Sequence, residues 1–216
     1  MSVTAVRRFP AILFLVGTCA AAGGLVRALA AGPGHASGMA AVLVAAYLGW
    51  VFLEVGVSFR TAGEPASEDD RGSELLYGLA RLATVLAALY GPVPRAPWRP
   101  WMLIPAALLL AGAALRLLSI RTLGRFYSHR VRTVEDHRIA DGGPYRLLRH
   151  PAYTGMLLAH LGLVSFFCNP VSVVLLLGAF LPAIVYRIRV EERMLYSIDG
   201  YRAFALRRKR LVPFVW

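Results

Sequence analysis

The stretch D-G-G-P-Y-R-L-L-R-H-P-A-Y-T-G (residues 141–155) marks the point where the apolar helices of this 216-residue chain meet its polar residues. Two apolar segments follow it, and R-I-R-V-E-E (187–192) closes them. Arginine, histidine, tyrosine and glutamate thus gather at the ends of hydrophobic helices, where ionisable groups are costly unless they are used. The sequence therefore predicts a functional site at this end of the last two apolar segments.

The composition excludes a soluble globular protein. Hydrophobic residues make up 57% of the chain and charged residues 17%, and apolar runs of nearly twenty residues recur, which is typical of transmembrane helices. The net charge of +12 would suit a nucleic-acid partner only on a solvated basic face. Most basic residues instead lie beside apolar runs, as in cytoplasmic loops that face anionic headgroups. We predict an all-α integral membrane protein that binds no nucleic acid.

About six hydrophobic helices are expected. Four spans in the portion 1–119 are predicted at 10–31, 39–59, 75–90 and 101–119, and the first is long enough to cross about 30 Å of hydrocarbon. In the portion 120–216, the shorter segments 153–167 and 171–186 flank Asn169-Pro170, which predicts a tight turn and a short helical hairpin over 153–186. From residue 191 onward, apolar residues at helical spacing predict an amphipathic C-terminal helix. They are Leu195, Ile198, Tyr201 and Phe204.

The distribution of Lys and Arg predicts the orientation. If the first four spans cross alternately, the N-terminus, the 120–150 loop and the tail lie on one side, and only Arg95 and Arg99 lie on the other. Because cytoplasmic loops are enriched in Lys and Arg, we expect a multi-pass protein of the cell membrane with both termini in the cytoplasm.

Two sets of polar residues leave alternatives open. Ionisable residues within spans either pair with one another or snorkel to an interface, or they line the path of a small transporter; they are Arg27, Glu54, Arg81 and Arg116. Three histidines share the cytoplasmic region, but no cysteine or carboxylate accompanies them at ligand spacing, so no metal is predicted. They are His129, His137 and His150.

The motif itself suggests an anion site. Pro151 is suited to the first turn of a helix, and a helix N-terminus offers free N–H groups to a carboxylate; the alternative is a capped helix start with interfacial aromatic residues. Arg187 and Glu191 are four residues apart and share a helix face. They form either a surface ion-pair ladder or, if the hairpin returns them to the motif, part of a joint site.

R-H-P-A-Y-T-G (149–155), preceded by G-P-Y and followed by C-N-P (168–170) and R-x-x-x-E-E (187–192), resembles the isoprenylcysteine carboxyl methyltransferase family and its bacterial members. L-V-P-F (211–214) fits as well, and phospholipid methyltransferases share a looser form of the pattern. The resemblance covers about residues 120–216. It implies a membrane enzyme that uses S-adenosylmethionine, bound on the cytoplasmic side by this C-terminal portion.

The family pattern implies a role for each matching residue. Arg187 would face the acceptor, and Glu192 with His150 would be the candidate bases if the reaction needs one. The implied cofactor contacts are Arg130, His137, Arg138, Ile139, Ala140, Tyr145, His150, Pro151, Ala152, Tyr153 and Glu191.

The expected reaction is methyl transfer to a lipophilic acceptor, with a carboxylate such as that of a prenylated cysteine favoured. A sulfonium methyl is already activated and a carboxylate is already ionised at neutral pH, so positioning, which can supply roughly 7–11 kcal/mol, does most of the work. The alternatives are a phospholipid amine or a phenolic lipid as acceptor, which would require proton removal, and a transporter without enzymatic activity.

Overall fold

The computed structural model describes residues 3–30, 35–61, 72–92, 97, 99–124, 139–213 and 215–216. These parts are helical apart from turns and one isolated bridge between Leu148 and Lys209. The helices are α1 (Val3–Ala30), α2 (His35–Thr61), α3 (Ser73–Tyr90), α4 (Leu103–Leu123), α5 (Pro151–Phe167), α6 (Pro170–Leu175), α7 (Leu181–Leu195) and α8 (Tyr201–Leu206). Short 3-10 turns are η2 (Pro100–Met102) and η4 (Gly143–Arg146), and a π-helical segment, η5 (Leu176–Phe180), joins α6 to α7.

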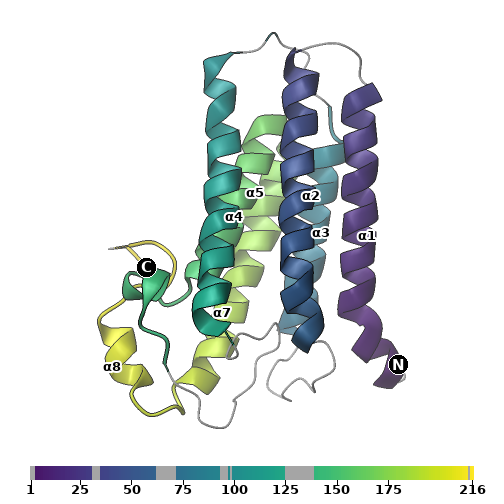
Figure 1. Cartoon of the computed structure of the whole chain (residues 1–216). Coiled ribbons are helices and arrows are strands. Elements are labelled where there is room, and N and C mark those ends of the chain that lie inside the picture. Colours follow the sequence, from purple (N-terminus) through teal and green to yellow (C-terminus); the bar gives the residue numbers. More distant parts are fainter. Residues whose placement is uncertain are drawn as a thin grey trace.

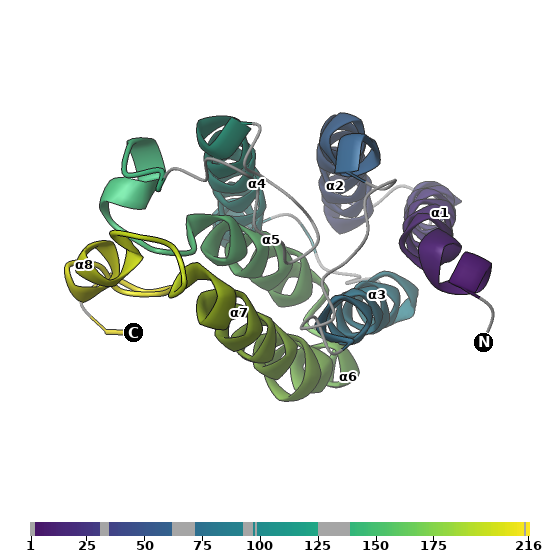
Figure 2. The ribbon, with the colours of Figure 1, turned by 90° about the horizontal axis from the view of Figure 1, so that it is seen from below.

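The long helices stand side by side, and α8 lies at the side of the lower end of the bundle (Figure 1). Seen from below, α5 lies in the middle, with α4, α3 and α7 around it (Figure 2). Among the described residues, five helical segments are long and apolar enough to cross a membrane, whereas α5 is shorter. Because the neighbouring helices bury most of α5, it needs little contact with lipid. The predicted all-α membrane architecture is confirmed.

Two predicted boundaries are wrong. The second arm of the hairpin does not end at residue 186, because α6, η5 and α7 run as one helical segment of 26 residues, Pro170–Leu195. Two of the charged residues that suggested an end are in fact buried inside the bundle: Arg187 is 4% and Glu192 3% exposed. The tail is also not one helix, since α7 ends before Tyr196 and Gly200, with φ of 82°, starts α8.

Glycines bring α4 and α5 into backbone contact. A Cβ atom on Gly112 would lie 2.3 Å from the Ala159 nitrogen, and one on Gly155 would lie 2.6 Å from the Gly112 carbonyl oxygen. Gly162 continues the contact, with the Pro105 carbonyl oxygen at 2.5 Å. Small residues at such spacing let membrane helices approach closely. The glycine of the R-H-P-A-Y-T-G motif therefore has a packing role, and this contact crosses the predicted division of the chain at residue 119.

The ionisable residues of the spans have partners within the protein. Arg116 pairs with Glu54, so for these two residues pairing applies among the alternatives that the sequence left open. Arg81 donates to the Tyr47 hydroxyl at 3.3 Å, and its guanidinium lies 5.4 Å from the centre of the Trp50 ring. Arg27 donates to the carbonyls of Leu89 and Gly91, both at 2.7 Å, and so satisfies acceptors at the C-terminal end of α3.

Candidate active site

The R-H-P motif is held in place by the C-terminal tail. The Arg149 and His150 amides donate to the carbonyls of Lys209 and Arg210 at 2.8 and 3.1 Å. Pro151 occupies the first position of α5, where its missing N–H costs nothing. Because the tail follows α7 in the chain, these two bonds fix the start of α5 beside the end of α7. The last and first turns of two membrane helices thus meet at one end of the bundle.

Glu192 is the centre of an ion-pair cluster at this meeting point. Its Oε1 lies 2.9 Å from Arg149 Nη1 and 3.3 Å from His150 Nε2, and its Oε2 lies 2.8 and 2.7 Å from Nε and Nη2 of Arg210. A carboxylate has about four acceptor positions, and four nitrogens occupy them. The hydrogen bond to Glu192 raises the pKa of the Arg210 guanidinium. The role of Glu192 in the reaction stays a prediction, and these contacts favour a positioning role over proton transfer.

Arg187 lies one helical turn before Glu191, inside the bundle. Its Nε donates to the Tyr153 hydroxyl of α5 at 3.0 Å and its Nη1 to the Ser73 hydroxyl of α3 at 3.1 Å. The guanidinium also lies 5.8 Å from the centre of the Tyr77 ring. Three helices therefore fix the plane of a buried guanidinium, which is the geometry needed to bind a carboxylate in one orientation.

Glu191 differs from its neighbour Glu192. Its side chain is 33% exposed, and its Oε2 lies 4.0 Å from Nδ1 of His150. This oxygen atom is itself buried and accepts no hydrogen bond from the described residues. Consecutive residues of an α-helix are about 100° apart around its axis, so the two carboxylates face different surroundings. Glu191 is consequently the carboxylate that can still accept hydrogen bonds from a ligand.

A second hydrophobic cluster lies between the loop before α5 and α8. It joins Tyr145 and Tyr201 to Phe204 and Ala205, and Ile139 and Ala140 pack against it. The Tyr201 hydroxyl is buried, and in the part of the chain that the structure describes it has no hydrogen-bond partner. Burial raises the pKa of the Tyr201 phenol, and the nearby carboxylates of Glu192 and Glu191 raise it further. The hydroxyl therefore stays protonated and is available as a donor.

Most of the residues selected from the sequence come together. Tyr145, His150, Tyr153, Arg187, Glu191 and Glu192 lie at the junction of η4, α5, α7 and α8, and Pro151 and Ala152 form the first turn of α5. Arg130, His137 and Arg138 lie outside the described residues. Arg149, Tyr201 and Arg210 also belong to the candidate site, although they are not among the residues predicted for it. The sequence does contain a signal for Arg149, because this residue belongs to the R-H-P-A-Y-T-G motif. Tyr201 appears in the sequence only as one of the apolar residues of the predicted C-terminal helix.

This arrangement can be compared with known proteins. A family model described as the isoprenylcysteine carboxyl methyltransferase (ICMT) family matches residues 104–197. Protein-S-isoprenylcysteine O-methyltransferase B of Arabidopsis thaliana is 31% identical over 148 residues, which are 64% of this chain and 74% of that protein. Protein-S-isoprenylcysteine O-methyltransferase of Saccharomyces cerevisiae is 32% identical over 114 residues, 50% of this chain and 47% of the yeast protein.

The fold is also similar to that of a solved structure, the eukaryotic intramembrane Ras methyltransferase ICMT. The TM-score is 0.52 at 19% sequence identity, and the match covers 96% of this chain and 74% of that one. The region matched by the family model contains α5 and α7, which carry the buried arginine and both carboxylates. This chain is a member of the isoprenylcysteine carboxyl methyltransferase family.

Proposed function

We propose that this membrane methyltransferase transfers a methyl group from S-adenosylmethionine to the carboxylate of a lipophilic acceptor, such as a prenylated cysteine, at the cytoplasmic surface of the membrane. One observation carries the proposal: a buried guanidinium and a carboxylate with an unused buried oxygen lie one turn apart on α7, beside the first turn of α5. The names of the relatives support the choice of acceptor.

The side chains fit the donor at two points. The amino-acid part of S-adenosylmethionine carries an ammonium group, for which the Oε2 atom of Glu191 is a buried acceptor without a hydrogen bond. Tyr201 offers a buried hydroxyl, also without a partner, to the acceptor atoms of the same molecule. When bound, the cofactor supplies a methyl group that its sulfonium already activates. Beside Glu191 and Tyr201, the residues that would hold it are Ile139, Ala140, Tyr145, His150, Pro151, Ala152 and Tyr153, with Arg130, His137 and Arg138 as sequence-based candidates.

Arg187 would bind the acceptor carboxylate. A planar guanidinium holds a carboxylate through two parallel hydrogen bonds, and Tyr153 and Ser73 already fix its orientation. Arg187 is 4% exposed, so the carboxylate that reaches it would leave bulk water. Loss of water strengthens the ion pair and removes the hydration shell of the attacking oxygen. The chain's contribution is therefore positioning and exclusion of water.

A carboxylate acceptor agrees with the contacts of Glu192, since a carboxylate arrives ionised and needs no base. An amine or phenol would have to lose a proton, and the oxygens of Glu192 are occupied by Arg149, His150 and Arg210. We infer that Glu192 positions the motif and the tail and that the acceptor arrives ionised. Family membership favours this enzymatic role over the transporter alternative.

Glu191→Gln is expected to weaken binding of S-adenosylmethionine roughly ten- to a hundredfold, because a hydrogen bond to a charged group contributes about 1.5–3 kcal/mol. Calorimetric titration of the purified protein in detergent measures this directly. Asp199→Asn, which removes an exposed carboxylate from the tail, serves as the matched control and should leave affinity unchanged. Equal affinity of Glu191→Gln and wild type would remove Glu191 from the proposed cofactor site.

Arg187→Lys should leave cofactor affinity nearly unchanged and lower turnover roughly ten- to a hundredfold, since lysine keeps the charge but loses the planar fork. The measurement is steady-state methylation of a farnesylated cysteine derivative with labelled cofactor. Arg189→Lys, an exposed position two residues later, is the control. If Arg187→Lys instead impaired cofactor binding and left turnover at saturation intact, the assignment of Arg187 to the acceptor would be wrong.

A further inference from the structure

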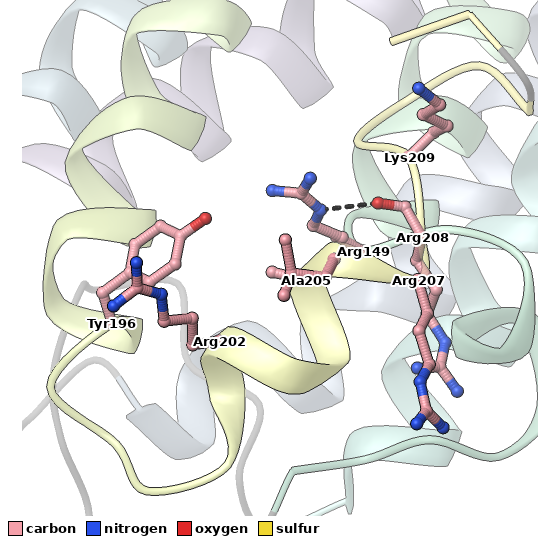
Figure 3. Close-up of a pocket in the computed structure, with 8 residues that line it drawn as sticks. Arg149, Tyr196, Arg202, Ala205, Arg207, Arg208 and Lys209 are labelled. Atoms are coloured by element: carbon pink, nitrogen blue, oxygen red, sulfur yellow. Dashed lines mark hydrogen bonds between the residues drawn. The ribbon is translucent and has the colours of Figure 1, made fainter.

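A basic hollow lies beside the proposed active site, between the end of α7, α8 and the residue that precedes the His150-Pro151 start of α5 (Figure 3). It has a volume of about 690 Å³. Five of the eight lining residues are cationic and none is acidic. None of the residues proposed to contact the cofactor belongs to this lining. The lining residues are Arg149, Tyr196, Arg202, Ala205, Leu206, Arg207, Arg208 and Lys209.

Carboxylates of the described residues neutralise only part of this positive charge. Arg149 is partly neutralised by Glu192, but Arg202 and Arg207 are exposed, and their side chains make no hydrogen bond or ion pair within the described residues. Arg208 stacks 4.2 Å from the centre of the Phe204 ring, and its side chain points away from Arg202 (Figure 3). The hollow thus offers N–H donors and unbalanced charge to an anion of several oxygens.

Exposed apolar side chains surround the same cations. Leu206, in the lining, is 82% exposed. The bridge between Leu148 and Lys209 places Leu147, 69% exposed, beside the basic segment, and Val212 follows that segment at 49% exposure. Apolar side chains next to cations at the end of a membrane helix are typical of a surface that sits at the headgroup level. A soluble anion would have no use for them.

We propose that this hollow binds the phosphate headgroup of an anionic phospholipid, with Arg202 and Arg149 on the phosphate and Leu206 against the upper acyl chains. Arg207 and Arg208 add positive charge from the other side of α8 (Figure 3). The tail carries the hollow at the side of the bundle, directly after the last membrane helix (Figure 1), which puts it at the depth of the headgroups. A basic pocket in this position is the kind of site that retains an acidic lipid. The lipid would hold α8 against the membrane surface.

The test compares lipid retention by the purified protein in detergent, measured by native mass spectrometry. Wild type is expected to retain phosphatidylglycerol in preference to phosphatidylcholine. In Arg202→Gln/Arg207→Gln the apparent Kd for phosphatidylglycerol should rise at least about tenfold, because each cation near the surface contributes roughly a fivefold factor. The matched control, Arg121→Gln/Arg189→Gln, removes two exposed charges outside the hollow and should retain the lipid.

Three results would overturn the proposal. They are equal retention of both lipids by wild type, unchanged affinity in Arg202→Gln/Arg207→Gln, and displacement of phosphatidylglycerol by an equimolar amount of inorganic phosphate, which would identify a soluble anion as the ligand. Titration with S-adenosylmethionine completes the test. Unchanged cofactor affinity in the double variant supports a separate lipid site, and a parallel loss of cofactor affinity would assign the hollow to the cofactor.

Discussion

Gly155→Ala is expected to destabilise the protein by about 3 kcal/mol, although it adds only one methyl group. The new Cβ would lie 2.6 Å from the Gly112 carbonyl oxygen and 2.7 Å from the Arg116 nitrogen. These are backbone atoms, so no side chain can rotate away and α4 must shift away from α5. We therefore expect a cost at the upper end of the range that is usual for overpacking. Unfolding in mixed micelles with increasing denaturing detergent would measure the loss of stability.

Gly49→Ala in α2 is the matched control. No heavy atom lies within 4 Å of the position of its Cβ, and alanine is the better helix former, so this change should be neutral or stabilise by up to about 1 kcal/mol. The two glycine-to-alanine substitutions should therefore differ by about 3 kcal/mol or more in their effect on stability. Similar effects of both would mean that α4 and α5 do not approach as closely as described.

Glu192→Ala is expected to cost about 3 kcal/mol and to release the tail. It leaves Arg149, Arg210 and His150 around an empty position, and removing one partner of a buried ion pair typically costs 3–5 kcal/mol. We take the lower value because the Arg210 side chain is 30% exposed and partly screened. The same unfolding experiment gives the stability, and the rate of limited proteolysis within 196–210 reports on the tail.

Glu191→Gln separates this effect from that of a neighbouring carboxylate. It should leave both stability and proteolysis near wild-type values, because Glu191 is a third exposed and its only described ionic contact is the 4.0 Å approach to His150. If Glu192→Ala unfolded no more easily than Glu191→Gln, the four contacts of Glu192 would contribute nothing measurable and the proposed positioning role would fail.

The sequence was sufficient to predict the class of fold and to select most residues of the candidate site. Apolar runs reveal membrane helices because hydrocarbon allows no other spanning structure for a chain of this composition. The motif and R-x-x-x-E-E could be assigned to one site because the Asn169-Pro170 turn had to return the chain to the same end of the bundle. The tyrosine, histidine, arginine and glutamate side chains named in advance do meet there.

Tertiary contacts set the limits of that prediction. The end of α7 was placed too early because Arg187 and Glu192 are charged, and only their partners on α3, α5 and the tail make their burial possible. The sequence does not distinguish the two adjacent glutamates, because the different surroundings of Glu191 and Glu192 come from tertiary contacts. Tyr201 was equally ambiguous, since its apolar ring fits a surface helix and its unpartnered hydroxyl becomes evident only in the folded chain.

The π-helical segment Leu176–Phe180 sets the rotational phase of everything after it. A π turn accommodates an extra residue within an otherwise α-helical segment, and one residue rotates an α-helix by about 100°. If the same residues formed an uninterrupted α-helix, the positions that now hold Arg187 and Glu192 would hold Tyr186 and Glu191. The residues before and after the π turn can therefore face their surroundings in different helical registers. A single extra residue far from the proposed site thus determines which charged side chains point into it.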